Sequence, residues 1–351
     1  MLSRRATQAL LLLIVGVWPA LGAGCSSTPL DSAPPTIAPA QPAVSPPVSR
    51  TPAGAVLPLA TGATAAVFDN GTHQLAVLVP GADPAAPASV AVSGVPQHPP
   101  RVIALPGPAT ALAADGRGTI YLAARGGYYV ADLSTGRTAT VSVSQAQQVE
   151  FTAIARRADG TLVLGGSDGA VYLLAALAPG AGATAAIATR ITLFARVDAL
   201  VTQGNTTVVL DRGQTSVTTI DAGGHAEQAL RAGEGATTLA ADPIGVVLAA
   251  DTRGGQLLVY GVDPLMLRQA YPVGQAPYGL AGSRALAWVT QTTSNMVIGY
   301  DLSTGIPVEK VRYPTVQQPN SLAFDDTTGT LYVVSGSGAG VQVIEHAAGT
   351  P

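Results

Sequence analysis

The 351-residue chain has one cysteine, one lysine and little charge of either sign. A single cysteine excludes a disulfide framework. Charged residues make up only 11% of the chain. This excludes the clustered Lys and Arg of a nucleic-acid-binding surface and of a polybasic membrane-binding face. After residue 25, no apolar run approaches the ~20 residues that a membrane-spanning helix needs.

Glycine, proline and short apolar runs are plentiful instead. The chain has 40 Gly and 27 Pro, and 47% of its residues are apolar. Frequent turn residues disfavour long helices, and short apolar runs between them are typical of buried strands. The many alanines, and 17 Arg against the single Lys310, indicate GC-rich coding, as in actinobacteria. We therefore expect an all-β protein.

The first 24 residues have the architecture of a bacterial signal peptide. Arg4 and Arg5 give a positively charged start, residues 9–17 (ALLLLIVGV) form a short apolar core, and Gly-Ala-Gly precedes Cys25. A cysteine directly after small residues resembles the lipobox of bacterial lipoproteins, where the thiol is acylated and the chain is cut before it. We expect residues 1–24 to be removed and Cys25 to carry a diacylglyceryl group and palmitate.

Two alternatives stay open at this end of the chain. Gly22 stands where a lipobox usually has Leu, which leaves an ordinary secretory peptide as the second interpretation. The pair Arg4-Arg5 leaves both Sec and twin-arginine export open. Acylation is favoured because an exported protein with one cysteine has no disulfide use for its thiol.

Residues 25–54 are expected to be a lipid-anchored tether rich in Pro, Ala and Ser. The stretch 28–54 has few large apolar groups, so it cannot bury enough surface to offset its ordering entropy. Pro-rich chain favours the extended polyproline II conformation at ~3.1 Å per residue, which gives a reach of up to roughly 80 Å. Without Arg4 and Arg5 the mature chain has 16 basic and 21 acidic residues, a net charge of −5.

An internal repeat fills the rest of the chain. Each unit begins with a short apolar strand, and successive units start 45, 42, 46, 39, 41 and 42 residues apart. This period is the size of a four-stranded propeller blade. The seven starting strands are anchored by these apolar residues: Val67, Leu112, Ile154, Leu200, Leu239, Leu280 and Leu322.

Seven anchors predict a seven-bladed β-propeller of four-stranded blades over residues 55–351. The last repeat, from Pro319, supplies only three strands (SLAF, TLYVV and VQVIEH). An unassigned segment, residues 55–60 (AVLPLA), precedes the first anchor. We expect it to add the missing strand and close the ring, which removes the exposed edges of an open array.

Aspartates recur at the predicted turns. The sequence Asp-Leu-Ser-Thr-Gly occurs at residues 132–136 and again at 301–305. Such turns join strands through side-chain capping and a glycine with positive φ. We expect Asp132 and Asp301 to be turn formers and not ligands. The same interpretation holds for Asp115, Asp159, Asp221 and Asp263.

Several motifs resemble known bacterial propellers. The pattern V-G-x-x-P-x-G-L-A at residues 273–281, followed by W-V-T and Y-D-L-S-T-G, resembles YncE-like repeats of cell-envelope propellers. Residues 34–47, 68–72 and 123–133 are similar to the conserved mycobacterial lipoproteins of the LppL group. The resemblance covers nearly the whole chain. It implies a propeller in the cell envelope and no particular activity.

Residues that mark the propeller enzymes are missing from the sequence. Repeats ending in Trp, sialidase S-x-D-x-G-x-T-W turns, and WD and kelch signatures do not occur, and Glu is scarce. No histidine pair has metal-ligand spacing, and there is no G-x-S-x-G or phosphate loop. We therefore expect no catalytic residues, no metal site and no cofactor. Of the four histidines, His73, His98 and His225 are expected in solvated loops, and the fourth is His346.

A binding surface is the more plausible site. On a propeller, the loops entering each inner strand and those between second and third strands share one face. Arginines from different repeats on this face suit an anionic group, since guanidinium forks match carboxylate or phosphate; solvated loop arginines are the alternative. The candidate binding residues are Arg125, Asp168, Arg212, Arg253, Tyr278 and Asn320, with Asn295 and Gln318 nearby.

Together these observations predict a lipid-anchored propeller on the outer face of the cell membrane. Its expected role is a non-catalytic binding or scaffold module for an envelope protein or small-molecule ligand, without nucleic acid as a partner. The alternative is a hydrolase or lyase that works in the central channel on a small envelope metabolite. Acidic residues clustered in the channel would favour the enzyme, and an apolar channel with one polar face the binding module.

Overall fold

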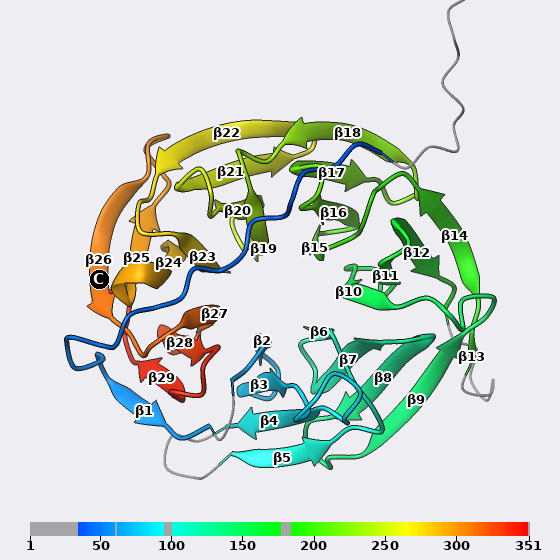
Figure 1. Cartoon of the computed structure of the whole chain (residues 1–351), viewed down its shortest axis with the longest axis horizontal. Helices are drawn as coiled ribbons and strands as arrows, with labels where there is room; N and C mark the ends of the chain where they lie inside the picture. The colour runs from blue at the N-terminus through cyan, green and yellow to red at the C-terminus, as the bar shows by residue number, and fades with distance from the viewer. Residues whose placement is uncertain (1–33, 60–61, 95–99, 177–183, 350–351) are drawn as a thin grey trace, which may run out of the picture. The chain divides into compact units, whose positions relative to one another are not determined.

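Short apolar strands form seven antiparallel sheets around a central axis in the computed structural model (Figure 1). The structure describes residues 34–59, 62–94, 100–176 and 184–349. The expectations for the signal peptide and for Cys25 lie outside these residues. Among the described residues, no helix is long and apolar enough to cross a membrane.

Each sheet is a blade whose strands follow one another from the channel outward. Blades 1 and 2 contain β2 (Ala65–Asp69), β3 (Gln74–Val79), β4 (Ser89–Ser93), β5 (Arg101–Ala104), β6 (Ala111–Ala114), β7 (Thr119–Ala124), β8 (Gly127–Asp132) and β9 (Thr138–Val143). Blades 3 and 4 contain β10 (Phe151–Arg156), β11 (Leu162–Gly166), β12 (Ala170–Leu174), β14 (Ile187–Thr192), β15 (Ala199–Gln203), β16 (Thr206–Asp211), β17 (Ser216–Ile220) and β18 (Ala226–Arg231). The short β13 (Thr184–Ala185) pairs in parallel with β9 at the edge of blade 2.

The remaining blades continue the pattern. Blades 5 and 6 contain β19 (Ala236–Asp242), β20 (Val246–Asp251), β21 (Gln256–Val262), β22 (Leu265–Pro272), β23 (Pro277–Gly282), β24 (Ala287–Gln291), β25 (Met296–Asp301) and β26 (Val308–Pro314), with the 3-10 turn η1 (Thr292–Ser294) between β24 and β25. Blade 7 contains β27 (Pro319–Asp325), β28 (Thr330–Ser335), β29 (Val341–Ile344) and β1 (Ala55–Leu57). The seven predicted anchors all fall in the seven innermost strands, so the repeat assignment is confirmed.

The N-terminal strand closes the ring as predicted. Strand β1 pairs with β29 in antiparallel register, with Ala55 opposite Val343 and Leu57 opposite Val341. The strand is shorter than the predicted 55–60, and residues 60–61 lie outside the described part. The seventh sheet therefore combines the two ends of the domain, and β1 pairs the edge of β29 that would otherwise be free.

Aspartates form the turns that the sequence predicted. Asp132 accepts hydrogen bonds from the backbone N–H of Ser134 and Thr135 (2.8 and 2.7 Å). These bonds, with those from the Ser134 and Thr135 hydroxyls, lower the pKa of Asp132 to about 2. The glycine that follows, Gly136, has a φ of +74°, which residues with a Cβ rarely adopt.

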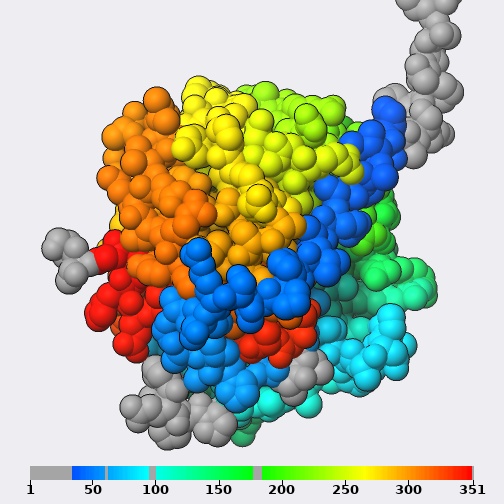
Figure 2. Space-filling view, turned by 60° about the vertical axis from the view of Figure 1, so that its left-hand side comes forward, coloured from blue at the N-terminus to red at the C-terminus, as the bar shows by residue number. Residues whose placement is uncertain are grey.

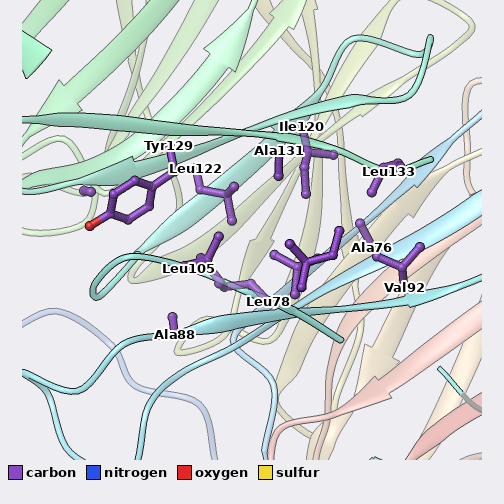
Figure 3. Close-up of a cluster of buried hydrophobic side chains, with 13 residues drawn as sticks. Ala76, Leu78, Ala88, Val92, Leu105, Ile120, Leu122, Tyr129, Ala131 and Leu133 are labelled. Atoms are coloured by element: carbon purple, nitrogen blue, oxygen red, sulfur yellow. The ribbon is translucent and has the colours of Figure 1, made fainter. Parts of the chain in front are cut away.

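Apolar packing between neighbouring blades makes up the core. Seven buried clusters lie at the seven blade interfaces, including the interface between blades 7 and 1 that closes the ring. Figure 3 shows the cluster between blades 1 and 2, where Leu78 faces Ile120 and Leu122. Because the second strand of a blade is buried on both faces, the sequence has near-continuous apolar runs such as β20 (VVLAAD).

One buried guanidinium joins blades 3 and 4 by polar contacts. Arg157 is 1% exposed, and its Nε donates to Thr207 Oγ1 at 2.9 Å. Its Nη atoms donate to the carbonyls of Ala222 and Asp221 at 3.0 and 2.7 Å. Burial lowers the pKa of Arg157, opposed by the charges of Asp159 and Asp221. The carbonyls satisfy a charge that burial alone would make costly.

Residues 34–54 lie on the propeller, which differs from the expectation of a free tether over this stretch. The segment runs in extended form across one face from blade 4 to blade 7 (Figure 1). In Figure 2 it is the blue ridge on the yellow and orange blades. The composition argument missed this because backbone carbonyls, not apolar side chains, carry most of the contacts. We call residues 36–46 the strap.

Candidate functional site

The seven inner strands surround a channel cavity of about 320 Å³. Its described lining is mostly Thr, Ala and Leu, and the charged side chains in it are Asp198 and Arg212. The uncharged lining includes these residues from all seven blades: Ala65, Thr110, Leu112, Thr152, Leu200, Thr237, Leu239, Tyr278, Leu280, Asn320 and Leu322. The cavity is thus a nearly neutral channel that is lined both by apolar side chains and by hydroxyl groups.

Threonine hydroxyls at the start of the inner strands join neighbouring blades. Thr110 Oγ1 donates to the Phe151 carbonyl at 2.6 Å, which links blade 2 to blade 3. Thr152 donates in the same way to the Val197 carbonyl, and Thr238 to the Tyr278 carbonyl. These hydroxyls satisfy carbonyls at the blade junctions, so their role is structural.

Arg212 and Asp198 form the charged part of the channel mouth. The Arg212 backbone N–H donates to Asp198 Oδ2 at 2.8 Å, and Arg196 Nε lies 3.3 Å from Asp198 Oδ1. Burial raises the pKa of Asp198, opposed by the bond from Arg212 and by the two arginine charges. Arg212 Nε is buried and has no hydrogen-bond partner among the described residues. A donor is therefore left over beside the channel.

Tyr278 and Asn320 line the same cavity as Arg212. Burial raises the pKa of Tyr278, and the charge of Arg212 opposes this rise. Asn320 Oδ1 accepts a hydrogen bond from Gln318 Nε2 at 3.0 Å. Blades 4, 6 and 7 thus bring three of the predicted binding residues to one channel mouth, which we define as Asp198, Arg212, Tyr278 and Asn320.

The strap crosses this mouth and is held by its backbone carbonyls. Five of them accept hydrogen bonds from side chains on blades 4 to 7. The pairs are Arg253 Nη2 to Ala38 O (2.7 Å), Arg212 Nη2 to Ala40 O, Gln318 Nε2 to Ala43 O (2.8 Å), Gln317 Nε2 to Ser45 O (3.1 Å) and Asn295 Nδ2 to Pro46 O (2.8 Å). All five donors are guanidinium or amide groups. The sequence placed four of them in or beside the binding face, and only Gln317 was not predicted.

Donors of the strap complete the contact. The Ile37 N–H donates to the Gly213 carbonyl at 2.8 Å, and the Ser45 N–H to Gln318 Oε1 at 2.9 Å. The Ser45 hydroxyl donates to the Thr292 carbonyl at 2.7 Å. Ser45 is 3% exposed, whereas Val44 beside it is 87% exposed. The strap therefore presents its polar backbone to the propeller and an apolar side chain to solvent.

Glycines on the propeller allow the strap to approach closely. A Cβ at Gly235 would lie 3.0 Å from the Ala40 Cβ and 2.9 Å from the Arg253 Cβ. A Cβ at Gly213 would lie 3.2 Å from the Thr36 side chain. A side chain at either position would push the strap away from the face.

The other predicted binding residues lie away from the strap. Arg125 Nη2 donates to Gln148 Oε1 at 2.8 Å on blade 2. Asp168 accepts from Arg190 Nη2 at 3.0 Å and from the Tyr172 hydroxyl at 2.5 Å. The structure thus brings Arg212, Tyr278 and Asn320 together in the channel and Arg253 to the strap, while Arg125 and Asp168 have partners on blades 2 and 3.

A second cavity opens between the chain that follows the strap and blade 6. It has a volume of about 590 Å³ and is lined by residues 48–50, Gln275, Gln291, Asn295 and Arg312 among others. Arg312 is held by Glu309 through two bonds of 2.8 and 2.7 Å. The side chains here are mainly hydrogen-bonding groups, as on the rest of this face.

Titratable residues do not gather elsewhere in the described chain. No three His, Cys, Asp or Glu side chains within it lie close enough together to hold a metal ion. His225 lies 3.2 Å from Asp221 in a turn. His73 packs edge-on against Phe68, and His98 lies outside the described residues.

Comparison with known proteins places the fold in its class. No family model matches the sequence, and no curated protein matches it. A solved structure titled "Streptogramin B lyase structure" is similar, with a TM-score of 0.63 over 82% of this chain and 95% of that chain. At 12% sequence identity the similarity shows the fold alone. The protein is a seven-bladed β-propeller.

Proposed function

We propose that the protein is a lipid-anchored β-propeller of the bacterial cell envelope, of the LppL kind within the YncE-like group, and that it acts as a binding or scaffold module. The sequence before the domain supports export and acylation at Cys25. The channel face supports the binding role. It would meet its partner, an envelope protein or a small molecule, outside the cytoplasm.

One observation carries this proposal: the channel face holds an extended segment by side-chain donors. Guanidinium and amide groups from four blades bind five backbone carbonyls of the strap. Arg212 Nε remains as a donor without a partner beside the channel. A face made of donors suits a ligand rich in acceptor oxygens, such as a carboxylate or a peptide backbone.

Docking of the strap shortens the free part of the tether. If Cys25 is lipidated, only the chain from Cys25 to Pro34 spans the distance between membrane and domain. Fully extended, that stretch reaches about 30 Å. Released as polyproline II up to Ala55, the tether would instead reach about 90 Å. The docked strap therefore favours a propeller held close to the membrane surface.

A channel-centred hydrolase or lyase is the second candidate. Asp198 in the channel has a raised pKa and lies beside Arg212, and the solved structure of similar fold is titled as a lyase. An acid–base role needs a carboxyl of this kind within reach of a substrate. Loss of a measured turnover in Asp198→Asn, with partner capture unchanged, would favour the enzyme.

The anchor is tested by Cys25→Ala. We expect the unaltered protein to lose residues 1–24, to gain the mass of acyl groups and to partition into detergent, as measured by intact mass and phase separation. Cys25→Ala should leave the membrane fraction because alanine has no thiol to carry the acyl anchor. Membrane retention and processing of Cys25→Ala identical to those of the unaltered protein would contradict the assignment. Cross-linked partners should be captured from membranes by the lipidated protein only.

A further inference from the structure

The strap has the properties of a polyproline-type ligand. Its sequence, TIAPAQPAVSP, contains Pro39, Pro42 and Pro46, and the structure assigns it to no strand. An extended Pro-rich chain makes no internal hydrogen bonds, so its carbonyls are free to accept bonds from a binding surface. It is also stiff before binding, which lowers the entropy cost of docking.

The residues that bind the strap come from two kinds of loop on four successive blades. Arg212, Arg253 and Asn295 each follow the second strand of blades 4, 5 and 6, and Gln317 and Gln318 precede the inner strand of blade 7. They form a row of donors along the strap, from the carbonyl of Ala38 to that of Pro46. A row of donors to backbone carbonyls reads an extended shape and not a particular side chain.

The close approach of the strap to the propeller limits which side chains the strap can carry. Ala40 is 7% exposed and faces Gly235, where any larger side chain on the strap would collide with the propeller. Val44, by contrast, points to solvent and is free to vary. The surface therefore fits a chain of Pro and small residues.

We propose that this face is a recognition surface for an extended, Pro/Ala-rich peptide, that the strap is its resident occupant, and that a peptide of the same chemistry binds in trans when the strap is released. The proposal rests on the binding role given above and names the partner class for that site. A tethered occupant acts at an effective concentration in the millimolar range, so it outcompetes a free peptide while it is docked.

The experiment measures binding of a labelled synthetic peptide, residues 34–49, to the full chain by fluorescence anisotropy. Two variants release the strap: replacement of residues 35–48 by Gly and Ser at equal length, and Ala40→Arg, which places a large cation against Gly235 and two arginines. Both retain β1 and therefore the closed ring. We expect each to bind the peptide at least tenfold more tightly than the unaltered chain.

Two controls define specificity. A peptide with Pro39→Gly and Pro42→Gly should bind several-fold more weakly, because it loses the stiff extended form. Gln318→Ala in the released background should also weaken binding, because it removes the donor to Ala43 O and the acceptor for the Ser45 N–H. Circular dichroism and Tm verify that the released variants remain folded.

Equal peptide binding by released and unaltered chains, or equal binding of the Gly-substituted peptide, would overturn the proposal. Should the Gly/Ser replacement fail to fold, Ala40→Arg decides alone, since it changes a single residue of the strap. Failure of peptide binding while Cys25-dependent membrane attachment and partner capture persist would remove this peptide class and leave the wider binding role standing.

Discussion

The blade interfaces and the strap interface are two ways of holding one chain together. Between blades, seven apolar clusters are almost wholly buried, as at Leu122 and Trp288 with 0% exposure each. Under the strap, the contacts are hydrogen bonds from long polar side chains, and only Ala40 and Ser45 of the strap are buried. The first kind of interface specifies the fold, and the second reads an extended backbone.

The two kinds of interface differ in how much they contribute to the free energy of unfolding. Apolar burial contributes roughly 25 cal/mol per Å² and accumulates over many side chains. A protein hydrogen bond contributes a net ~1 kcal/mol, while ordering one residue costs about 1–2 kcal/mol. For the strap these two contributions are of the same order, and the proline content reduces the ordering cost. A marginal interface is suited to release, whereas the blade interfaces are not.

The largest contrast is expected between Trp288→Ala and Val44→Ala. Trp288 stacks on Phe324 of the next blade with ring centroids 5.6 Å apart, and its Nε1 donates to Ser283 Oγ. Its truncation leaves a cavity and should lower the free energy of unfolding by about 4 kcal/mol. Val44→Ala, at an exposed strap position, should change it by less than about 0.5 kcal/mol.

Urea unfolding followed by Trp-independent far-UV circular dichroism measures both variants. A loss of similar size in the two would mean that the strap is part of the core and not a separable occupant.

Asp242 is a charged residue buried among the blades, and its replacement should stabilise the protein, whereas Trp288→Ala should destabilise it. Burial raises the pKa of Asp242 to about 6, opposed by the bond from the Ile244 N–H and aided by the charge of Asp326. In the unfolded chain the pKa is ~3.9, so the native state binds the proton more tightly between pH ~4 and ~6. This group therefore destabilises the fold as pH rises through that window, and the cost is fully present at pH 7.

Asp242→Asn should remove that cost. We expect the free energy of unfolding to rise by about 3 kcal/mol at pH 7, and the difference from the unaltered protein to vanish near pH 4. Asn still accepts the bond from Ile244 through Oδ1. Tm measured at both pH values gives the answer, and a gain that is equal at pH 4 and pH 7 would exclude titration of Asp242 as the cause.

The sequence predicted the features that depend on local pattern. Period, strand order and ring closure followed from the apolar anchors such as Leu280 and from residues 55–60, because every blade repeats the same burial. Turn aspartates such as Asp132 followed from spacing to glycine. These are short-range rules, and the structure bears them out.

Features that depend on distant polar contacts could not be read in this way. Ser45 bonds with Gln318, and Arg212 with Ala40, across more than 170 positions of sequence. Composition gives residues 34–54 no apolar reason to dock, and hydrogen bonds to backbone carbonyls leave no side-chain signal on the strap. Asp198 was missed because a single acid before an inner strand looks like any other turn aspartate.

Amide hydrogen exchange tests the docking of the strap directly, with only a small expected effect on stability. Amide exchange should be slowed at Ile37 and Ser45, whose N–H groups donate to Gly213 O and Gln318 Oε1, and should be fast at Gln41 and Val44. Gln318→Ala removes the acceptor for the Ser45 N–H, so protection there should fall about tenfold or more. Stability should change by less than about 1 kcal/mol, as for most surface substitutions.

Gln317→Ala is the matched control for this exchange experiment. Gln317 donates to the carbonyl of Ser45 and leaves its N–H bond in place, so protection at Ser45 should decrease much less than in Gln318→Ala. If both variants lose protection equally at Ser45 and at Ile37, the strap docks as one cooperative unit, and loss of any single contact releases it. If Ile37 stays protected in Gln318→Ala, the strap opens from the blade 7 end first.

Fast exchange at Ile37, Gln41, Val44 and Ser45 in the unaltered protein would mean that the strap interface is open most of the time. In that case the blade interfaces would stay packed in the native state, while the strap would dock only transiently.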